Sequence, residues 1–192
     1  MQDEAGKWFS LAVDAFQQAN YNLAIELFSR AIEQNPRYVE AYTNRGAARR
    51  KMGDHAEAIT DFTKALEIDP TEVKVYMNRG LAQSEMGNKL GAMADYTRAI
   101  ELKPDYAKAF YNRGSVRAEL GNKLGAIDDF SQAIDLDPSY ARAYYSRGLT
   151  YRQIGNMEQA VMDLQKSAEF YQEKGLADEY EEAMSEFRKI KL

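Results

Sequence analysis

Two charged residue types recur at a fixed spacing in this sequence and could form ion pairs inside a fold. Arginine recurs every 34 residues at Arg45, Arg79, Arg113 and Arg147, and aspartate recurs with it at Asp61, Asp95, Asp129 and Asp163. At the equivalent positions 34 residues before Arg45 and Asp61, the chain has Leu11 and Leu27, so both charges are absent together. A half-buried arginine is costly unless its charge is paired, so we infer that each arginine contacts its aspartate. Binding of a phosphate or an acidic ligand by these arginines is the alternative.

A second set of polar residues could recognise another molecule. It consists of an asparagine series, Asn44, Asn78 and Asn112, and a basic series, Lys74, Lys108 and Arg142, with the same spacing. Regularly spaced amides offer hydrogen-bond donors and acceptors to an extended backbone, whatever its side chains. The basic series has two interpretations that the sequence leaves open, contact with a ligand or solvation of a helix start.

Residues for catalysis or for a metal site are missing. The chain has no cysteine and one histidine, His55, which follows Asp54 and is expected to be a solvated turn residue. The glycines follow the repeat and form no phosphate-binding loop. Catalysis needs a convergent site that departs from the repeat, so we expect no enzyme activity, no metal and no cofactor.

The elements that must position these residues follow from the 34-residue period. Proline recurs with it at Pro36, Pro70, Pro104 and Pro138, and repeats decide an architecture before other patterns do. The period divides the chain into residues 5–38, 39–72, 73–106, 107–140 and 141–174. In each repeat the fourth residue is aromatic, the eighth is small, the twentieth is alanine and the twenty-fourth is bulky. This pattern predicts two helices that pack large side chains against small ones.

Each repeat is expected to be a helical hairpin. The fifteenth residue is glycine in four repeats and the sixteenth is asparagine or aspartate in all five, as is typical of helix ends and N-caps. Proline, which cannot donate into the helical ladder, ends the second helix in four repeats.

Residues 175–192 are expected to form one more helix. They place apolar side chains at helical spacing, at Leu176, Tyr180, Met184, Phe187 and Ile190. A terminal repeat exposes a face without a neighbour, so this helix is expected to cap the last repeat. An interaction helix is the alternative.

The residues recurring over 5–174 resemble the tetratricopeptide repeat (TPR) family. The resemblance implies an all-α fold, a right-handed superhelical solenoid of five tandem helix-turn-helix repeats plus a C-terminal capping helix. It implies a single domain over residues 1–192. Family members bind very different partners, so the fold alone names none of them.

In that family the first helices of successive repeats line a concave groove that holds a peptide or a helix of a partner. Transferred by position, the resemblance places Asn44, Lys74, Asn78, Lys108, Tyr111, Asn112, Arg142 and Tyr145 in the groove. We therefore expect a protein-protein interaction adaptor or assembly scaffold whose partner is a protein or peptide.

The first repeat departs most from the others and leaves an apolar end. Phe9, Val13 and Phe16 occupy its groove positions, and exposed apolar patches favour association. A partner or a second copy of the chain is expected to dock there. A self-associating scaffold, and with it a homo-oligomer, is thus an alternative function.

A further alternative is a co-chaperone that grips the acidic tail of a heat-shock chaperone. The family's clamp for such tails uses five polar residues, and the corresponding positions here hold Phe9, Val13, Asn44, Lys74 and Asn78. Only Asn44 and Lys74 match, so the clamp is only partly present.

Composition narrows the partners and the location. The chain has 25 basic and 30 acidic residues and a net charge of −5, which argues against nucleic acid as a partner. No apolar stretch approaches a membrane span of roughly 20 residues, and the acidic N-terminus is unlike a secretory signal. We expect a soluble, cytoplasmic protein without direct membrane insertion, although a signal removed in processing would leave no trace.

Overall fold

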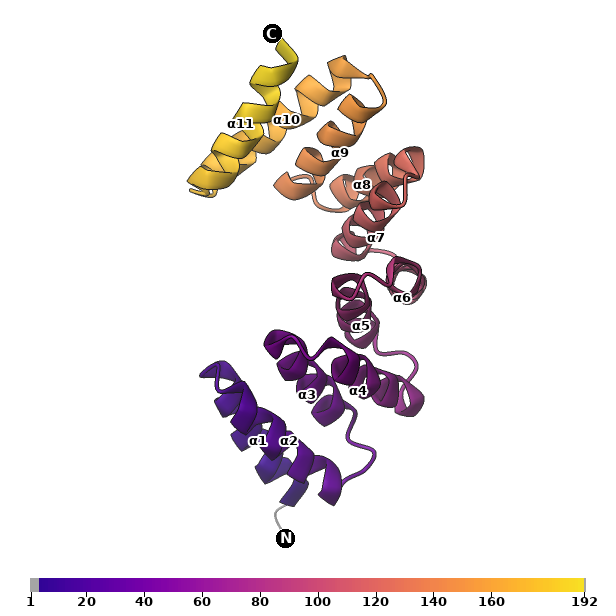
Figure 1. Cartoon of the computed structure of the whole chain (residues 1–192), viewed down its shortest axis with the longest axis vertical. Helices are drawn as coiled ribbons and strands as arrows, with labels where there is room; N and C mark the ends of the chain where they lie inside the picture. The colour runs from indigo at the N-terminus through magenta and orange to yellow at the C-terminus, as the bar shows by residue number, and fades with distance from the viewer. Residues whose placement is uncertain (1–3, 192) are drawn as a thin grey trace. The chain divides into compact units, whose positions relative to one another are not determined.

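The computed structural model describes residues 4–191, and every regular element within them is an α-helix. Eleven helices, α1 to α11, follow one another in this part of the chain, and the first ten form five antiparallel pairs (Figure 1). The predicted all-α repeat fold with five helix pairs and a C-terminal helix is thereby confirmed. The helices belong to two compact units, Met1–Leu102 and Lys103–Leu192, which we describe in turn.

The N-terminal unit holds three helix pairs, each within one predicted repeat. Its helices are α1 (Glu4–Gln17), α2 (Tyr21–Gln34), α3 (Val39–Met52), α4 (His55–Ile68), α5 (Val73–Glu85) and α6 (Lys89–Leu102). The core of the second repeat contains Ala58, Phe62 and Ala65 of α4, and Val75 of α5 joins the same cluster. Each pair therefore also packs on the next pair within this unit.

The C-terminal unit holds two further pairs and one last helix. Its helices are α7 (Ala107–Glu119), α8 (Lys123–Leu136), α9 (Ala141–Gln153), α10 (Met157–Glu173) and α11 (Ala177–Lys191). The second helix of the last pair is 17 residues long, against 14 for α8. The apolar clusters of this unit join Ala133 of α8 to Ala143 of α9, and Ala168 of α10 to Ala183 of α11.

Large-into-small packing holds the two helices of each pair together. A Cβ atom added to Gly80 would lie 2.7 Å from Cε1 of Tyr96, which is fully buried. The equivalent distance from Gly46 to the ring of Phe62 is 2.8 Å. Atoms at such distances clash, so the small residue at position eight is required by the ring at position twenty-four.

The turn within each pair needs a left-handed backbone, which glycine adopts at little cost. Gly53, for example, has a φ of 89°, and the equivalent residue of the first repeat, Ala19, has a φ of 57°. The predicted N-caps are confirmed for the asparagines, since the Asn122 side chain accepts a hydrogen bond from the Gly125 amide at 3.1 Å. Asp54 is the exception, because it stands at the N-cap but accepts no capping hydrogen bond.

The last helix, α11, covers the last repeat as predicted. Tyr180 and Met184 pack against a buried cluster that contains Ala168 and Tyr171 of α10. Leu176 precedes the helix and is 39% exposed, so its assignment to the helix was wrong. Residue 192 lies outside the described residues. None of the helices within residues 4–191 has the length and apolar character of a membrane span.

Candidate functional site

The predicted arginine and aspartate pairs are present in both units. In the second repeat, Arg45 donates two hydrogen bonds to the carboxylate of Asp61, at 3.0 and 2.7 Å. Asp61 is 1% exposed, and Arg49 adds a third contact to it at 2.8 Å. The same two-pronged pair recurs in the later repeats, in Arg79 with Asp95, Arg113 with Asp129 and Arg147 with Asp163. These guanidinium groups are therefore occupied within the fold, which disfavours the alternative of phosphate binding.

The arginines also bridge to the preceding repeat, a role that the sequence analysis missed. The remaining nitrogen of Arg45 donates to the hydroxyl of Ser29 at 2.9 Å. Arg79 reaches the hydroxyl of Thr63 at 3.1 Å, and Arg147 reaches Ser131 at 2.9 Å. A hydroxyl residue at position 25 of the first four repeats was the available signal.

In the N-terminal unit, the structure places three of the predicted groove residues on the first helices α3 and α5. Asn44 and Asn78 are half-buried, whereas Lys74 is exposed. Within the described residues, the ammonium group of Lys74 has no ion pair. Met77, one residue before Asn78, is 4% exposed and belongs to the core, although its equivalents in the fourth and fifth repeats, Tyr111 and Tyr145, were assigned to the groove.

The apolar residues of the first repeat pack mainly on their own repeat. Phe9 contacts Phe28 with ring centroids 5.6 Å apart and stacks on Tyr38 at 4.9 Å. Val13 and Phe16 pack on the same buried cluster. Docking by Phe9, Val13 and Phe16 remains a prediction, since all three keep only part of their surface exposed.

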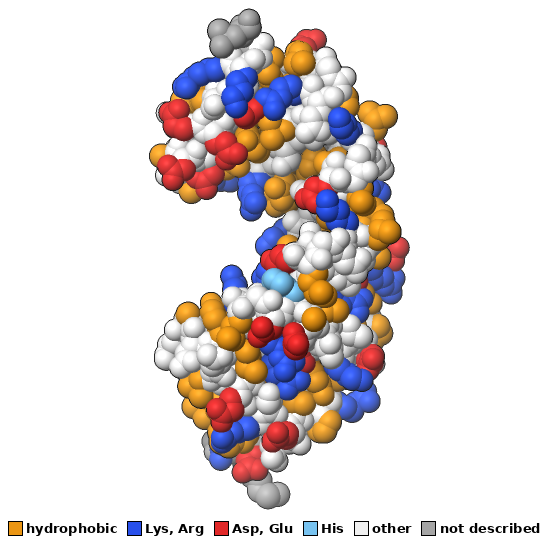
Figure 2. All heavy atoms as spheres, viewed as in Figure 1, with side chains coloured by type: hydrophobic (Ala, Val, Ile, Leu, Met, Phe, Trp, Pro, Cys, Tyr) orange, Lys and Arg blue, Asp and Glu red, His pale blue; other side chains and the backbone are white. Residues whose placement is uncertain are grey.

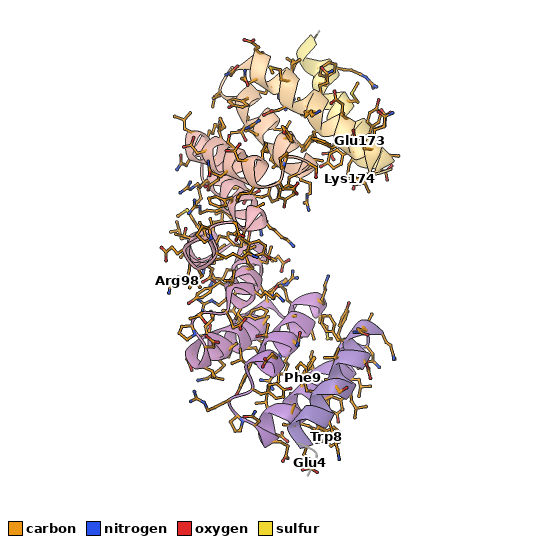
Figure 3. All side chains as sticks on the ribbon, turned by 180° about the vertical axis from the view of Figure 1, so that it is seen from behind. Glu4, Trp8, Phe9, Arg98, Glu173 and Lys174 are labelled. Carbon is orange, nitrogen blue, oxygen red and sulfur yellow. The ribbon has the colours of Figure 1, made fainter. Side chains whose placement is uncertain are left out.

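The most exposed large hydrophobic side chain of the first repeat is instead Leu11, at 51%. It lines a shallow hollow of about 140 Å³ together with Glu4, Lys7 and Trp8. The Trp8 ring is covered by Arg30 of α2, whose guanidinium carbon lies 4.8 Å from the ring centroid. Trp8 and Phe9 both project from α1 (Figure 3).

His55 is not the solvated turn residue that was expected. It begins α4, its side chain is 27% exposed, and its Nδ1 lies 3.2 Å from a carboxylate oxygen of Glu85. Arg50 donates to the other oxygen of Glu85 at 2.7 Å. His55 is visible at the surface in Figure 2. Among residues 4–191, no group of three or more histidine or acidic side chains could hold a metal ion.

In the C-terminal unit, the predicted groove residues differ in their access to solvent. Lys108 and Arg142 are exposed, and Asn112 is half-buried. The Asn112 amide nitrogen is buried without a hydrogen-bond partner. It could therefore donate to a ligand only after its side chain rotates.

A hollow of about 590 Å³ lies in the C-terminal unit, beside the start of α9. Four tyrosines line it, namely Tyr111, Tyr140, Tyr145 and Tyr171. Two cations and two carboxylates also line it, namely Arg142, Lys174, Glu179 and Glu182. Three of these residues, Tyr111, Arg142 and Tyr145, were predicted as groove residues, and the structure brings them together.

Two tyrosine rings of this hollow, Tyr111 and Tyr140, contact each other, and Arg142 lies over Tyr111. Tyr111 lies 5.1 Å from Tyr140 and 5.8 Å from Phe130 between ring centroids. The guanidinium carbon of Arg142 lies 5.5 Å from the centroid of Tyr111, a distance at which a cation is attracted to an aromatic face. Burial raises the pKa of Tyr140 to about 12, so this phenol is neutral near pH 7.

The side of the hollow formed by α11 carries its acidic groups. The Tyr145 hydroxyl donates to the carboxylate of Glu182 at 2.7 Å, and burial followed by this hydrogen bond raises the pKa of Tyr145. Arg152, further along α9, pairs with Glu186 of α11. The predicted groove residue Tyr145 is therefore already bound to the capping helix through its hydroxyl.

The basic residue Lys174 stands at the end of α10, at the turn that leads to α11 (Figure 3). Its ammonium group donates to the backbone carbonyl of Ser139 at 2.8 Å. Lys174, Tyr140, Tyr171 and Glu179 were missed by the sequence analysis. For Tyr140 a signal existed, because position 34 is also tyrosine in the first repeat, at Tyr38.

A second, smaller hollow of about 190 Å³ continues along α9. Ser146 lines both hollows, and Leu149 and Gln153 extend the second one towards the end of α9. Ser115 and Ala118 form its α7 side. Together the two hollows offer a partly apolar surface along α9, with hydroxyl and amide groups, that suits a chain segment better than a chemical reaction.

Comparisons with family models identify repeats along the chain. A model described as Tetratricopeptide repeat matches residues 39–72, and a second model with this description matches residues 141–174. A model described as TPR repeat matches residues 14–53, 91–121 and 118–155. None of these models describes an enzyme family. A search of curated protein sequences finds no match.

Solved structures share the fold over nearly the whole chain. A crystal structure of MamA is 26% identical, with a TM-score of 0.82, and the match covers 91% of this chain and 96% of that one. YrrB, a TPR protein described as having an unusual peptide-binding site, is 23% identical, with a TM-score of 0.75 and coverage of 94% and 93%. TTC0263, a thermophilic TPR protein from Thermus thermophilus, is 22% identical, with a TM-score of 0.71 and coverage of 94% and 98%. The last two likenesses establish the fold alone.

Proposed function

The chain belongs to the tetratricopeptide repeat family, and from this premise we propose that it is an adaptor or assembly scaffold for other proteins. Protein binding is the general role of this fold. In this proposal the first helices of the repeats bind an extended or helical segment of a partner. The partner contacts are Asn44, Lys74 and Asn78 in the N-terminal unit and Lys108, Asn112 and Arg142 in the C-terminal unit.

One observation carries the proposal, namely the contrast between two sets of basic residues. Arginines such as Arg45 and Arg79 are satisfied internally by buried aspartates. Lys74, Lys108 and Arg142 are exposed, and none of them forms an ion pair within residues 4–191. An exposed, unpaired cation beside amide and hydroxyl groups is available to a partner's carboxylate or carbonyl groups.

Affinity capture from a lysate of the source organism tests the proposal with matched variants. The binding variant carries Asn78→Ala, Lys108→Ala and Asn112→Ala. The control variant carries three changes at exposed positions of the second helices, Lys64→Ala, Gln132→Ala and Lys166→Ala. Circular dichroism and thermal unfolding show whether both variants remain folded.

A partner that the wild type and the control variant retain, and that the binding variant loses, would support the first helices as the binding surface. If all three chains retain their partners equally, the binding surface lies elsewhere and the assignment is wrong.

Self-association through the first repeat is a second candidate function, favoured by the exposed leucines of that repeat. Leu11 is 51% exposed and Leu23 is 41% exposed, and repeated apolar surface of this kind favours association. Sedimentation velocity at increasing protein concentration tests it, with Leu11→Gln as the variant. A monomer at every concentration argues against this function.

The co-chaperone alternative finds less support in the geometry. Two of its five clamp positions hold Phe9 and Val13, which pack on the apolar cluster of the first repeat. Asn44 and Lys74 would then hold an acidic tail alone. Titration of a chaperone tail peptide tests this alternative, and binding in the low-micromolar range would restore it.

A further inference from the structure

We propose that the tyrosine-lined hollow of the C-terminal unit binds a large apolar side chain of the partner segment, while a carboxylate of the same segment pairs with Arg142. The inference rests on the proposed adaptor function and adds the chemistry of the segment that is recognised. It concerns only the C-terminal unit, in which all the residues of the hollow lie.

The size and walls of the hollow suit an apolar anchor. Its volume of about 590 Å³ falls within the range of roughly 300–1,000 Å³ that is usual for binding pockets. Tyr111 and Tyr140 are fixed by ring contacts, and Tyr171 is 6% exposed. A wall that is already ordered binds with a smaller entropic cost, because few side chains need to be immobilised.

The two cations that line the hollow select an apolar group over a further cation. Arg142 lies over the Tyr111 ring and already uses the cation-binding face of that ring. A second cation at this place would meet both Arg142 and Lys174.

Arg142 supplies the charged contact. Its guanidinium lies on the Tyr111 ring and, within the described part of the chain, makes no hydrogen bond and no ion pair. The planar guanidinium presents a fork of N–H donors that matches a carboxylate. An aspartate or glutamate close to the apolar anchor would therefore reach it.

The α11 side of the hollow limits how acidic the segment can be. Glu179 has no hydrogen bond or ion pair within residues 4–191, and Glu182 accepts only the Tyr145 hydroxyl. A second carboxylate directed towards α11 would meet like charge, whereas a lysine or arginine there would be attracted. The complementary segment thus has an acidic residue on the α9 side of the anchor and a neutral or basic residue on the α11 side.

Selection from a displayed library of random peptides, each of about 12 residues, tests this inference on the full chain. The wild type is compared with Arg142→Glu and with Lys166→Glu. The two variants make the same charge change at exposed positions of the same repeat, and only Arg142 lines the hollow, whereas Lys166 lies on the second helix α10. Circular dichroism verifies that each variant is folded.

The wild type and Lys166→Glu are expected to enrich peptides with tryptophan, phenylalanine or leucine beside an acidic residue. Arg142→Glu is expected to lose the acidic preference and to gain a basic one. In fluorescence anisotropy with one enriched peptide, Arg142→Glu should weaken binding about tenfold and Lys166→Glu less than about twofold. Replacing the apolar anchor of that peptide with alanine should also weaken binding at least about tenfold.

Other outcomes overturn the inference and separate it from the proposed function. If the enriched peptides keep their acidic residue on Arg142→Glu, or tolerate alanine at the anchor, the hollow is not their site. If binding depends on Lys108 and Asn112 but not on Arg142, the groove proposal stands and the hollow assignment is wrong. If the wild type enriches no peptide, the hollow assignment is also wrong, and the capture experiment decides the adaptor function separately.

Discussion

Arg79 holds Asp95 through two hydrogen bonds of 2.9 and 2.7 Å, although the two residues belong to different helices, α5 and α6. Asp95 is 4% exposed, and the side chain of Arg79 is 19% exposed. The hydrogen bond to Asp95, together with its negative charge, raises the pKa of Arg79. The pair is thus a buried charge contact that fixes the two helices of one repeat.

Replacing Asp95 with alanine should destabilise the chain by about 3–5 kcal/mol, because Arg79 would remain half-buried without its counter-charge. Urea unfolding followed by circular dichroism measures this loss. The control is the double variant Arg79→Leu with Asp95→Leu, which reproduces Leu11 and Leu27 of the first repeat. It should lose much less stability, and an equal loss in both variants would contradict the role of the unpaired charge.

Substituting glycine for Ala19 should stabilise the chain by about 1 kcal/mol. Ala19 has a φ of 57°, a left-handed conformation in which its Cβ atom is strained and glycine is not. The reverse change, Gly53→Ala at a φ of 89°, should destabilise by a similar amount. Thermal unfolding of the two variants measures both effects, and shifts of the same sign would show that the turn conformation is not the cause.

Tyr145→Phe should loosen α11 by about 1 kcal/mol, because it removes the hydrogen bond to Glu182 and keeps the ring. Hydrogen exchange of the α11 amides should then be about fivefold faster, while exchange in α7 and α8 stays unchanged. Tyr180→Phe is the matched control, since no hydrogen bond of the Tyr180 hydroxyl is present within the described residues. Equal exchange in the two variants would exclude a role for the Tyr145 hydroxyl in holding the cap.

Stability should fall as the pH rises from about 10 to about 12. The pKa of Tyr140 is raised from 10.0 to about 12, chiefly by burial, so the unfolded chain releases this proton first. The stability that the buried, neutral Tyr140 phenol contributes is therefore fully present below pH 10 and is lost as the pH rises towards 12. After solvent screening, the loss attributable to Tyr140 is at most about 2 kcal/mol. Urea unfolding at pH 9 and pH 11 measures the fall, and Tyr140→Phe should reduce it.

Much of the fold could be predicted from the sequence because its causes repeat. Gly80 and Tyr96 are typical, since a small residue and a ring at fixed positions imply contact between two helices. The pairing of Arg79 with Asp95 was predicted because the first repeat has leucine at both positions, Leu11 and Leu27, so the two charges are lost together. Such inferences succeed because each interaction lies within one repeat and is sampled several times.

The hollow could be predicted only in part. Tyr111, Arg142 and Tyr145 occupy recurring positions of the repeats, whereas Glu179 and Glu182 lie on α11, outside the repeats. Lys174 stands where the first, third and fourth repeats have tyrosine, so its role did not follow from theirs. The buried state of Met77 was missed for a related reason. Its position is occupied by different kinds of side chain along the repeats, so no rule for its burial emerges.

The bridge from an arginine to a hydroxyl of the preceding repeat has a consequence for how such a chain can grow by duplication. Arg79 belongs to one repeat and Thr63 to the one before. A copied inner repeat therefore carries an arginine that can bind the hydroxyl of the repeat before it, and a hydroxyl that can accept from the arginine of the repeat after it. Inserted beside another inner repeat, it can form both contacts. The first repeat, with Leu11, would offer no donor to a repeat placed ahead of it, and the fifth, with Gln165 at the hydroxyl position, would offer no serine or threonine to one placed behind. The interior repeats are therefore interchangeable in a way that the two outer ones are not.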